Sequence, residues 1–131
     1  MNVLDENFPG DQKVVLRAWG IPFRRIGPDL AHLGAQDPDI IPLLHQLRQV
    51  TFFTQDKGFG RPSLCHPAYC LVWLDVRPND AALYVRRFLK HPRFDTQAKR
   101  MGRVVRVRHD ALQVCQRNRP GWQIVSWTQS D

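Results

Sequence analysis

The sequence has few cysteines and no long apolar run. Its three cysteines, Cys65, Cys70 and Cys115, are widely spaced and form no Cys-x-x-Cys pair, which fits a reducing compartment better than a disulfide framework. No apolar stretch approaches the roughly 20 residues that a membrane helix needs. The N-terminus lacks the basic-then-apolar pattern of a secretory signal. We therefore expect a cytoplasmic protein that does not enter a membrane.

Internal repeats, low-complexity tracts and linkers are also missing from the 131 residues. A chain of this length suits one domain with one core. Its hydrophobic fraction of 43% and charged fraction of 24% are those of an ordinary globular protein. We predict a single domain that spans residues 1–131.

Acidic residues are scarce toward the C-terminus. Residues 77–119 carry twelve Lys and Arg against three Asp, whereas residues 1–76 carry seven against eight, and the whole chain has a net charge of +7. A basic half joined to an acid-bearing half would hold a polyanion by its phosphates while the acids act on it. The alternative is a solvated basic face that keeps the protein soluble.

Short apolar runs alternate with amphipathic stretches along the chain. Strands are expected at 2–5, 50–54, 70–75 and 102–108, with a proline-containing edge strand at 21–26 and a peripheral strand at 122–127. Helices are expected at 11–19, with apolar Val14, Val15, Ala18 and Trp19, and from Pro78-Asn79-Asp80 onward. This alternation predicts an α/β fold with a mostly parallel central sheet flanked by helices.

A further helix is expected from Asp37, which would be its N-cap, with Pro38 at the first helical position. Pro42 removes one backbone hydrogen bond early in this helix, so we expect a distorted first turn. The helix then carries a core-facing apolar stripe at helical spacing, formed by Ile40, Leu43, Leu44 and Leu47.

Carboxylates follow several of the expected strands. Asp5 and Asp56 come just after the strands at 2–5 and 50–54, Asp75 ends the strand at 70–75, and Asp37 begins the helix between the first two. If the first and third strands are neighbours, Asp5, Asp37 and Asp56 converge at one switch point of the sheet. Clustered carboxylates repel one another unless a cation neutralises them, and Mg²⁺ or Mn²⁺ would do so. We take these three as metal ligands, Asp75 as a further catalytic acid, and Glu6 and Asp39 as weaker candidates.

Each acid also has a plainer explanation. Asp37 would serve as a helix cap, Asp56 as a turn residue before Lys57-Gly58, and Asp75 as a solvated loop residue. Glu6 would point away from Asp5 on an extended chain. The placement of the acids relative to the strands is what favours a site.

The sequence resembles the compact PIN-like domains found as toxins, of the VapC-like type, in bacterial toxin–antitoxin pairs. The match lies in Leu4-Asp5-Glu6-Asn7, in Gly34-Ala35-Gln36-Asp37-Pro38-Asp39-Ile40 and in Thr54-Gln55-Asp56-Lys57-Gly58-Phe59-Gly60, and it covers roughly residues 2–76 in order. The resemblance implies a metal-dependent ribonuclease whose acids hold Mg²⁺ or Mn²⁺. It also implies a cognate antitoxin and a tendency to form homodimers or toxin–antitoxin hetero-oligomers.

One position departs from that pattern, because Gly58 stands where the family has a second acid in Asp-x-Asp-Phe. Three outcomes remain open. The site works with Asp5, Asp37 and Asp56, or Asp75 substitutes for the missing acid, or catalysis is weakened or lost.

Basic residues are the candidates for contact with nucleic acid. Lys57 and Arg61 flank the acids and would hold the scissile phosphate. An arginine-rich segment would position the RNA backbone or engage the antitoxin through Arg86, Arg87, Arg103, Arg106 and Arg108. The same arginines would serve a catalytically silent module that binds nucleic acid or an acidic partner.

Two other site types are weaker. A phosphoacceptor receiver domain would use Asp56, but the late strand ending in Val107-Arg108 offers no lysine. A zinc site from Cys65, His66 and Cys70 matches no familiar ligand spacing and has no second pair of ligands nearby.

Overall fold

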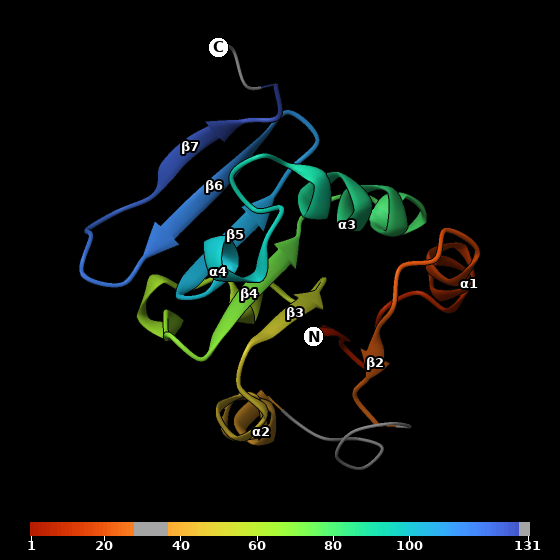
Figure 1. Ribbon diagram of the computed structural model, residues 1–131, viewed down its shortest axis with the longest axis horizontal. Coiled ribbons are helices and arrows are strands. Elements are labelled where there is room, and N and C mark those ends of the chain that lie inside the picture. The colour runs from red at the N-terminus through yellow and green to blue at the C-terminus, as the bar shows by residue number, and fades with distance from the viewer. Residues whose placement is uncertain (28–36, 129–131) are drawn as a thin grey trace.

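The computed structural model describes residues 1–27 and 37–128, and its centre is a seven-stranded sheet (Figure 1). The strand order is β2-β1-β3-β4-β5-β6-β7. The first five strands are parallel to their neighbours, whereas β5–β6 and β6–β7 are antiparallel. The strands are β1 (Asn2–Leu4), β2 (Arg24–Arg25), β3 (Val50–Thr54), β4 (Tyr69–Leu74), β5 (Arg103–Val107), β6 (Ala111–Gln116) and β7 (Gln123–Ser126). The prediction of an α/β fold with a mostly parallel central sheet is confirmed.

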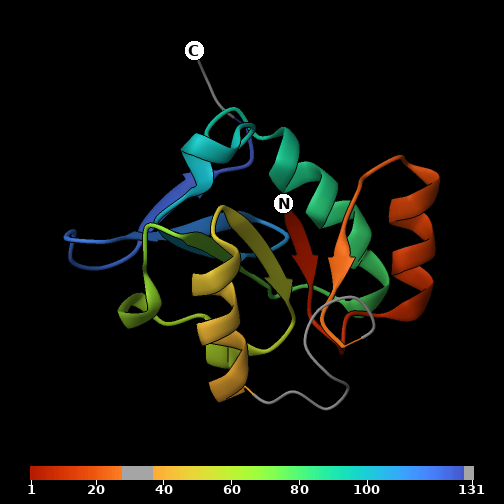
Figure 2. The same cartoon turned by 60° about the horizontal axis from the view of Figure 1, so that its bottom comes forward.

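Helices cover both faces of this sheet. They are α1 (Gly10–Ala18), α2 (Asp37–Leu47), α3 (Ala81–Lys90) and α4 (Gln97–Arg100), with 3₁₀ turns at Lys57–Phe59, Pro62–Leu64 and Pro78–Asp80. Figure 2 shows α2 on one side of the sheet and α1 with α3 on the other. No helix in the described ranges is both long and apolar enough to cross a bilayer.

The core lies on either side of the buried strand β3. Phe53 packs with Leu16 of α1 and Phe88 of α3, whereas Phe52 packs with Ile40 and Leu44 of α2. Consecutive residues of a strand point to opposite faces, so one short apolar run contributes to both layers. The buried run therefore places β3 at the centre of the sheet.

Several expected elements differ in the structure. The edge strand predicted at 21–26 is reduced to Arg24–Arg25, which follows Pro22, a residue that cannot donate to a strand ladder. Strand β6 and helix α4 were not predicted. Helix α1 buries Gln12 and Leu16, whereas Val14 is 61% exposed. Helix α2 starts at Asp37 itself and contains Pro42, and the predicted capping role of the Asp37 side chain lies outside the described part of the structure.

The connections around β1 create the place where a site is expected. From β1 the chain passes through α1 to β2 on one side, and then through α2 to β3 on the other. Leu4 pairs with Phe53 in the resulting parallel β1–β3 ladder. Such a reversal of direction is a topological switch point, and the order 2-1-3-4-5 is that of flavodoxin-like sheets. The first and third strands are therefore neighbours, which was the condition for Asp5 and Asp56 to lie at the same edge of the sheet.

Candidate functional site at the β1–β3 switch point

Asp5 leaves β1 and is fixed to the end of β3. Its backbone N–H donates to the carbonyl of Phe53 at 3.0 Å. One carboxylate oxygen accepts the Thr54 hydroxyl at 2.7 Å, and the other accepts the backbone N–H of Glu6 at 2.8 Å. The residue is only 7% exposed. Asp5 is therefore a buried acid held in one orientation by its neighbours.

Asp56 lies two residues beyond Thr54 and shares that hydroxyl. The backbone N–H of Asp56 donates to Thr54 Oγ1 at 3.0 Å, so the hydroxyl accepts from one acid residue and donates to the other. The Asp56 carboxylate accepts the backbone N–H of Gly58 at 2.8 Å and caps the turn Lys57–Phe59. Thr54 thus joins the two acids, and its position before Asp56 at the end of a buried strand was the available sequence signal for it.

The pKa of the Asp5 carboxyl is raised, chiefly because burial disfavours its charged form. Hydrogen bonds from Thr54 and Glu6 lower the pKa, while the negative charges of Asp56 and Glu6 raise it further. The charges of Asp5 and Asp56 therefore interact. A cation beside the pair would relieve both the burial cost and the repulsion.

Asp75 follows β4, the strand next to β3, and its charge is already paired. Its Oδ2 accepts from Arg106 Nη2 at 2.6 Å and Nε at 2.9 Å, and Arg106 lies over the Trp73 ring at 4.6 Å. Asp75, Asp56 and Lys57 line one open hollow of about 460 Å³. Asp75 thus shares a hollow with Asp56, but Arg106 would have to release it before it bound a cation.

Less is known of the other predicted acids, Asp37, Asp39 and Glu6. Asp37 lies at the start of α2, but the side chains of Asp37 and Asp39 fall outside the described residues. Glu6 has interactions of its own. Among the side chains that the structure describes, which exclude Asp37 and Asp39, no group of three or more His, Cys, Asp or Glu is arranged to hold a metal ion. This includes Cys65, His66 and Cys70.

Two carboxylates are nevertheless enough for Mg²⁺, which is commonly bound by one or two of them together with waters and substrate phosphate. Asp5 and Asp56 each spend carboxylate lone pairs on hydrogen bonds but retain others, since a carboxylate has about four acceptor positions. The chemistry of the pair therefore fits Mg²⁺ or Mn²⁺.

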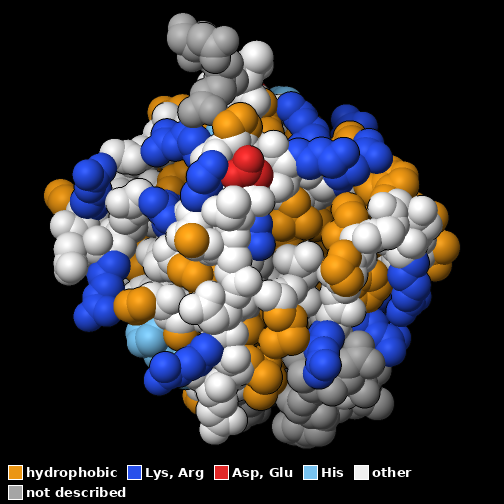
Figure 3. All heavy atoms as spheres, in the orientation of Figure 1, with side chains coloured by type: hydrophobic (Ala, Val, Ile, Leu, Met, Phe, Trp, Pro, Cys, Tyr) orange, Lys and Arg blue, Asp and Glu red, His pale blue; other side chains and the backbone are white. Residues whose placement is uncertain are grey.

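The predicted nucleic-acid contacts lie on several elements. Lys57 lines the hollow, and Arg61 donates to the Gly58 carbonyl at 3.0 Å. Arg86 lies over Trp19 at 3.7 Å, and Arg87 over Trp127 at 4.3 Å. Arg103 and Arg108 interact with residues near them in the chain. Arg103 donates to the carbonyls of Lys99 and Met101, and Arg108 lies 3.8 Å from the Asp110 carboxylate. Figure 3 shows basic side chains scattered over one face on which acidic side chains are scarce.

Comparisons with protein-family models, with curated proteins and with solved structures found no match for this chain. The site is therefore interpreted from its own geometry.

Proposed function

We propose that the protein is a PIN-like, metal-dependent endoribonuclease, the toxin of a type II toxin–antitoxin pair in the cytoplasm. The observation that carries the proposal is the pair of acids, Asp5 and Asp56, joined through Thr54 at the β1–β3 switch point. Ligands in open α/β sheets bind in the crevice outside the carboxyl ends of the strands. A buried acid with a raised pKa at such a position, as Asp5 is, is typical of functional sites.

In this proposal Asp5 and Asp56 hold Mg²⁺ or Mn²⁺, with Asp37 as the third ligand that the sequence match implies. When bound, the ion supplies an activated water and neutralises charge on the attacked phosphate. Thr54 and the Glu6 backbone orient the Asp5 carboxylate. Lys57, on the hollow beside Asp56, would contact the scissile phosphate. Arg106 would keep Asp75 in place or release it as a further acid.

RNA as a partner is suggested by the charge, whereas the antitoxin and the oligomers are suggested by the resemblance to PIN-like toxins. RNA would be held along its backbone by the basic residues of α3 and β5 and of the turn after β5, which contribute Arg86, Arg87, Arg103, Arg106 and Arg108. A cognate antitoxin would compete for part of the same surface. We also propose assembly as a homodimer or as a toxin–antitoxin hetero-oligomer.

The test is cleavage of a mixed single-stranded RNA by the purified protein with Mg²⁺, with Mn²⁺ and with chelator. Asp56→Asn and Asp5→Asn should lower the metal-dependent rate by about 100-fold or more, because a charged ligand is replaced by an amide. Asp110→Asn is the matched control, since it removes the same charge from an exposed residue in the β5–β6 connection. Equal cleavage by all four proteins would contradict the assignment.

A catalytically silent module is the second candidate. It is favoured by the ion pair that occupies Asp75 and by the absence of a carboxylate at Gly58. No cleavage under any condition, together with salt-sensitive RNA binding, would support this candidate over the nuclease.

A further inference from the structure

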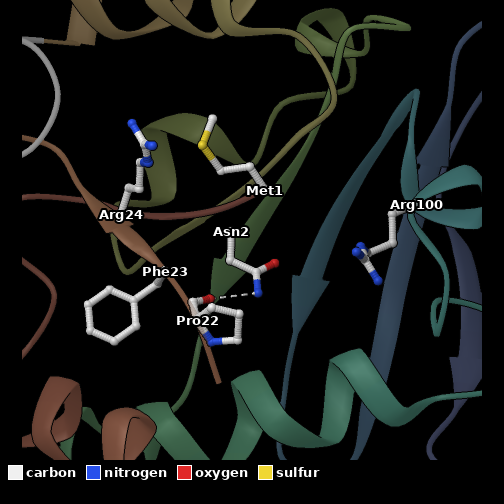
Figure 4. A pocket seen from close by; sticks show the side chains of 6 residues that line it. All are labelled: Met1, Asn2, Pro22, Phe23, Arg24 and Arg100. Carbon is white, nitrogen blue, oxygen red and sulfur yellow. Dashed lines mark hydrogen bonds between the residues drawn. The ribbon is translucent and has the colours of Figure 1, made fainter. Parts of the chain in front are cut away.

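A second pocket lies at the amino end of the parallel strands, opposite the end that carries Asp5 and Asp56. It has a volume of about 380 Å³ and is lined by Met1, Asn2, Pro22, Phe23, Arg24 and Arg100 (Figure 4). Met1, Pro22 and Phe23 provide apolar wall, and the Asn2 amide is tied to the Pro22 carbonyl at 3.1 Å. This volume falls within the range of small-molecule sites, which are apolar with a few placed polar groups.

Arg100 brings a permanent charge into the wall of this pocket. The residue is the last of α4 and is only 9% exposed. Its Nε donates to the Thr51 hydroxyl at 2.9 Å, and its Nη1 donates to the Phe94 carbonyl at 2.8 Å. Two of its five N–H donors are thereby used. Within the described residues Nη2 makes no hydrogen bond, and no buried side-chain nitrogen there lacks a partner, so Nη2 is not buried. Arg100 is one of the residues that line the pocket.

Among the described residues, no carboxylate forms a direct ion pair with Arg100. Burial lowers the pKa of the guanidinium group, and Asp95, the carboxylate that opposes this effect, is itself bound to Lys99 at 2.8 Å. No ion pair of Arg100 occurs within 4.0 Å in the described ranges. A buried cation without a counter-charge is costly. An anion in the pocket would offset that cost.

Arg24 adds a second cation on the other side of the pocket. Figure 4 shows Arg24 and Arg100 on opposite sides of Asn2, with the Arg100 guanidinium extending toward the pocket. Arg24 is exposed on the two-residue strand β2, and its guanidinium would have to turn toward Arg100 for both to contact one anion. A guanidinium binds phosphate and carboxylate with the same forked donors.

We propose that this pocket binds a small organic anion, whose phosphate or carboxylate group contacts Arg100 and Arg24 and whose apolar part rests on Met1, Pro22 and Phe23. The site is separate from the acid pair and needs neither metal nor RNA. Its ligand occupancy can therefore be measured independently of any nuclease activity.

The experiment is a titration of the metal-free protein with phenyl phosphate, benzoate and inorganic phosphate, followed by calorimetry and by the ¹³C-methyl NMR signal of Met1. We expect saturable binding of phenyl phosphate or benzoate that shifts the Met1 signal. Tighter binding of one identifies phosphate or carboxylate as the preferred group. Inorganic phosphate should bind at least about tenfold more weakly, because it leaves the apolar wall uncovered.

Arg24→Gln and Arg100→Gln should each weaken binding by about tenfold or more, since each removes a charge-assisted hydrogen bond. Arg119→Gln, at an exposed residue in the connection between β6 and β7, is the control of equal charge change. If Arg100→Gln does not fold, Arg24→Gln decides alone, because Arg24 is exposed. Three results overturn the proposal: no saturable binding, equal affinity for inorganic phosphate, or binding that persists undiminished in the arginine variants.

Discussion

At the scale of single residues, Gly60 shows how the turn after β3 is fitted against the sheet. A Cβ at this position would lie 2.4 Å from Cε3 of Trp73, a side chain of β4. Trp73 also carries Arg106 on its ring, and Arg106 holds Asp75. Gly60 is therefore required because a side chain would clash with Trp73. A left-handed backbone is not the reason, since φ of Gly60 is −89°.

We predict that Gly60→Ala destabilises the protein by about 1–3 kcal/mol, as overpacking of a filled interior does. The indole would have to shift and would carry the Arg106–Asp75 pair with it. Urea unfolding measures the effect. Gly10→Ala is the control, because no described atom lies within 4 Å of the place that its methyl group would take, and alanine suits a helix start. Equal stability of the two variants would disprove the close-contact argument.

Asp5 provides a second prediction, on pH. Because its pKa is raised in the folded state, the folded protein binds the proton more tightly than the unfolded chain. The stability from this group is fully present below the ordinary value of 3.8 and is lost as the pH rises through the folded pKa. Asp5→Asn stays neutral, so we expect this variant to gain stability relative to wild type as the pH rises.

Urea midpoints at about pH 4 and about pH 7, in chelator, measure this difference. Asp110→Asn is the control, since it makes the same substitution at an exposed residue. A constant difference between Asp5→Asn and wild type across this range would show that burial does not raise the pKa of Asp5.

At the scale of elements, the sequence predicts those whose signals are local. Strands β3 and β4 follow from buried apolar runs. Helix α3 follows from the Pro78–Asp80 start, and it buries Ala81, Tyr84, Val85 and Phe88 at helical spacing. Strand β6 was missed because Arg108 and Ala111 are joined through His109-Asp110, which lacks the glycine of common hairpin turns. Helix α4, with four residues, is too short for a periodic pattern.

In the candidate site too, the sequence predicts what depends on local signals and misses contacts between distant segments. Asp5 and Asp56 were placed by the rule that strand ends meet at one edge of a parallel sheet. The sequence did not predict the pairing of Asp75 with Arg106, because this pairing depends on the β4–β5 register that sets Trp73 opposite Arg106. The burial of Gln12 has the same origin: its side chain accepts the Ala82 N–H at 2.9 Å and so links α1 to α3. Contacts between distant segments are not encoded in local periodicity.

At the scale of the whole molecule, basic residues extend from the acid pair across the sheet. The acid pair belongs to the ends of β1 and β3, whereas most basic residues of segment 77–119 lie on α3, α4, β5 and β6, and one of them, Arg106, binds Asp75 at the hollow that Asp56 also lines. In the proposed function these residues hold the RNA backbone beside the cleaved bond and beyond it. A solvated basic face would have the same composition, but its arginines would not bind the phosphates of RNA.

RNA affinity measured against salt concentration distinguishes these cases. With Asp56→Asn to prevent cleavage, we expect log affinity to fall linearly with log salt, by about 0.7 for each phosphate neutralised on a single strand. Arg86→Gln with Arg87→Gln should make the slope shallower by about 1 to 1.5, because two phosphate contacts are lost. Lys13→Gln, a charge removed from α1, should leave it unchanged. A shallow slope that no variant alters would mean that the basic segment is a solvated face, because counterion release is the signature of phosphates bound by fixed cations.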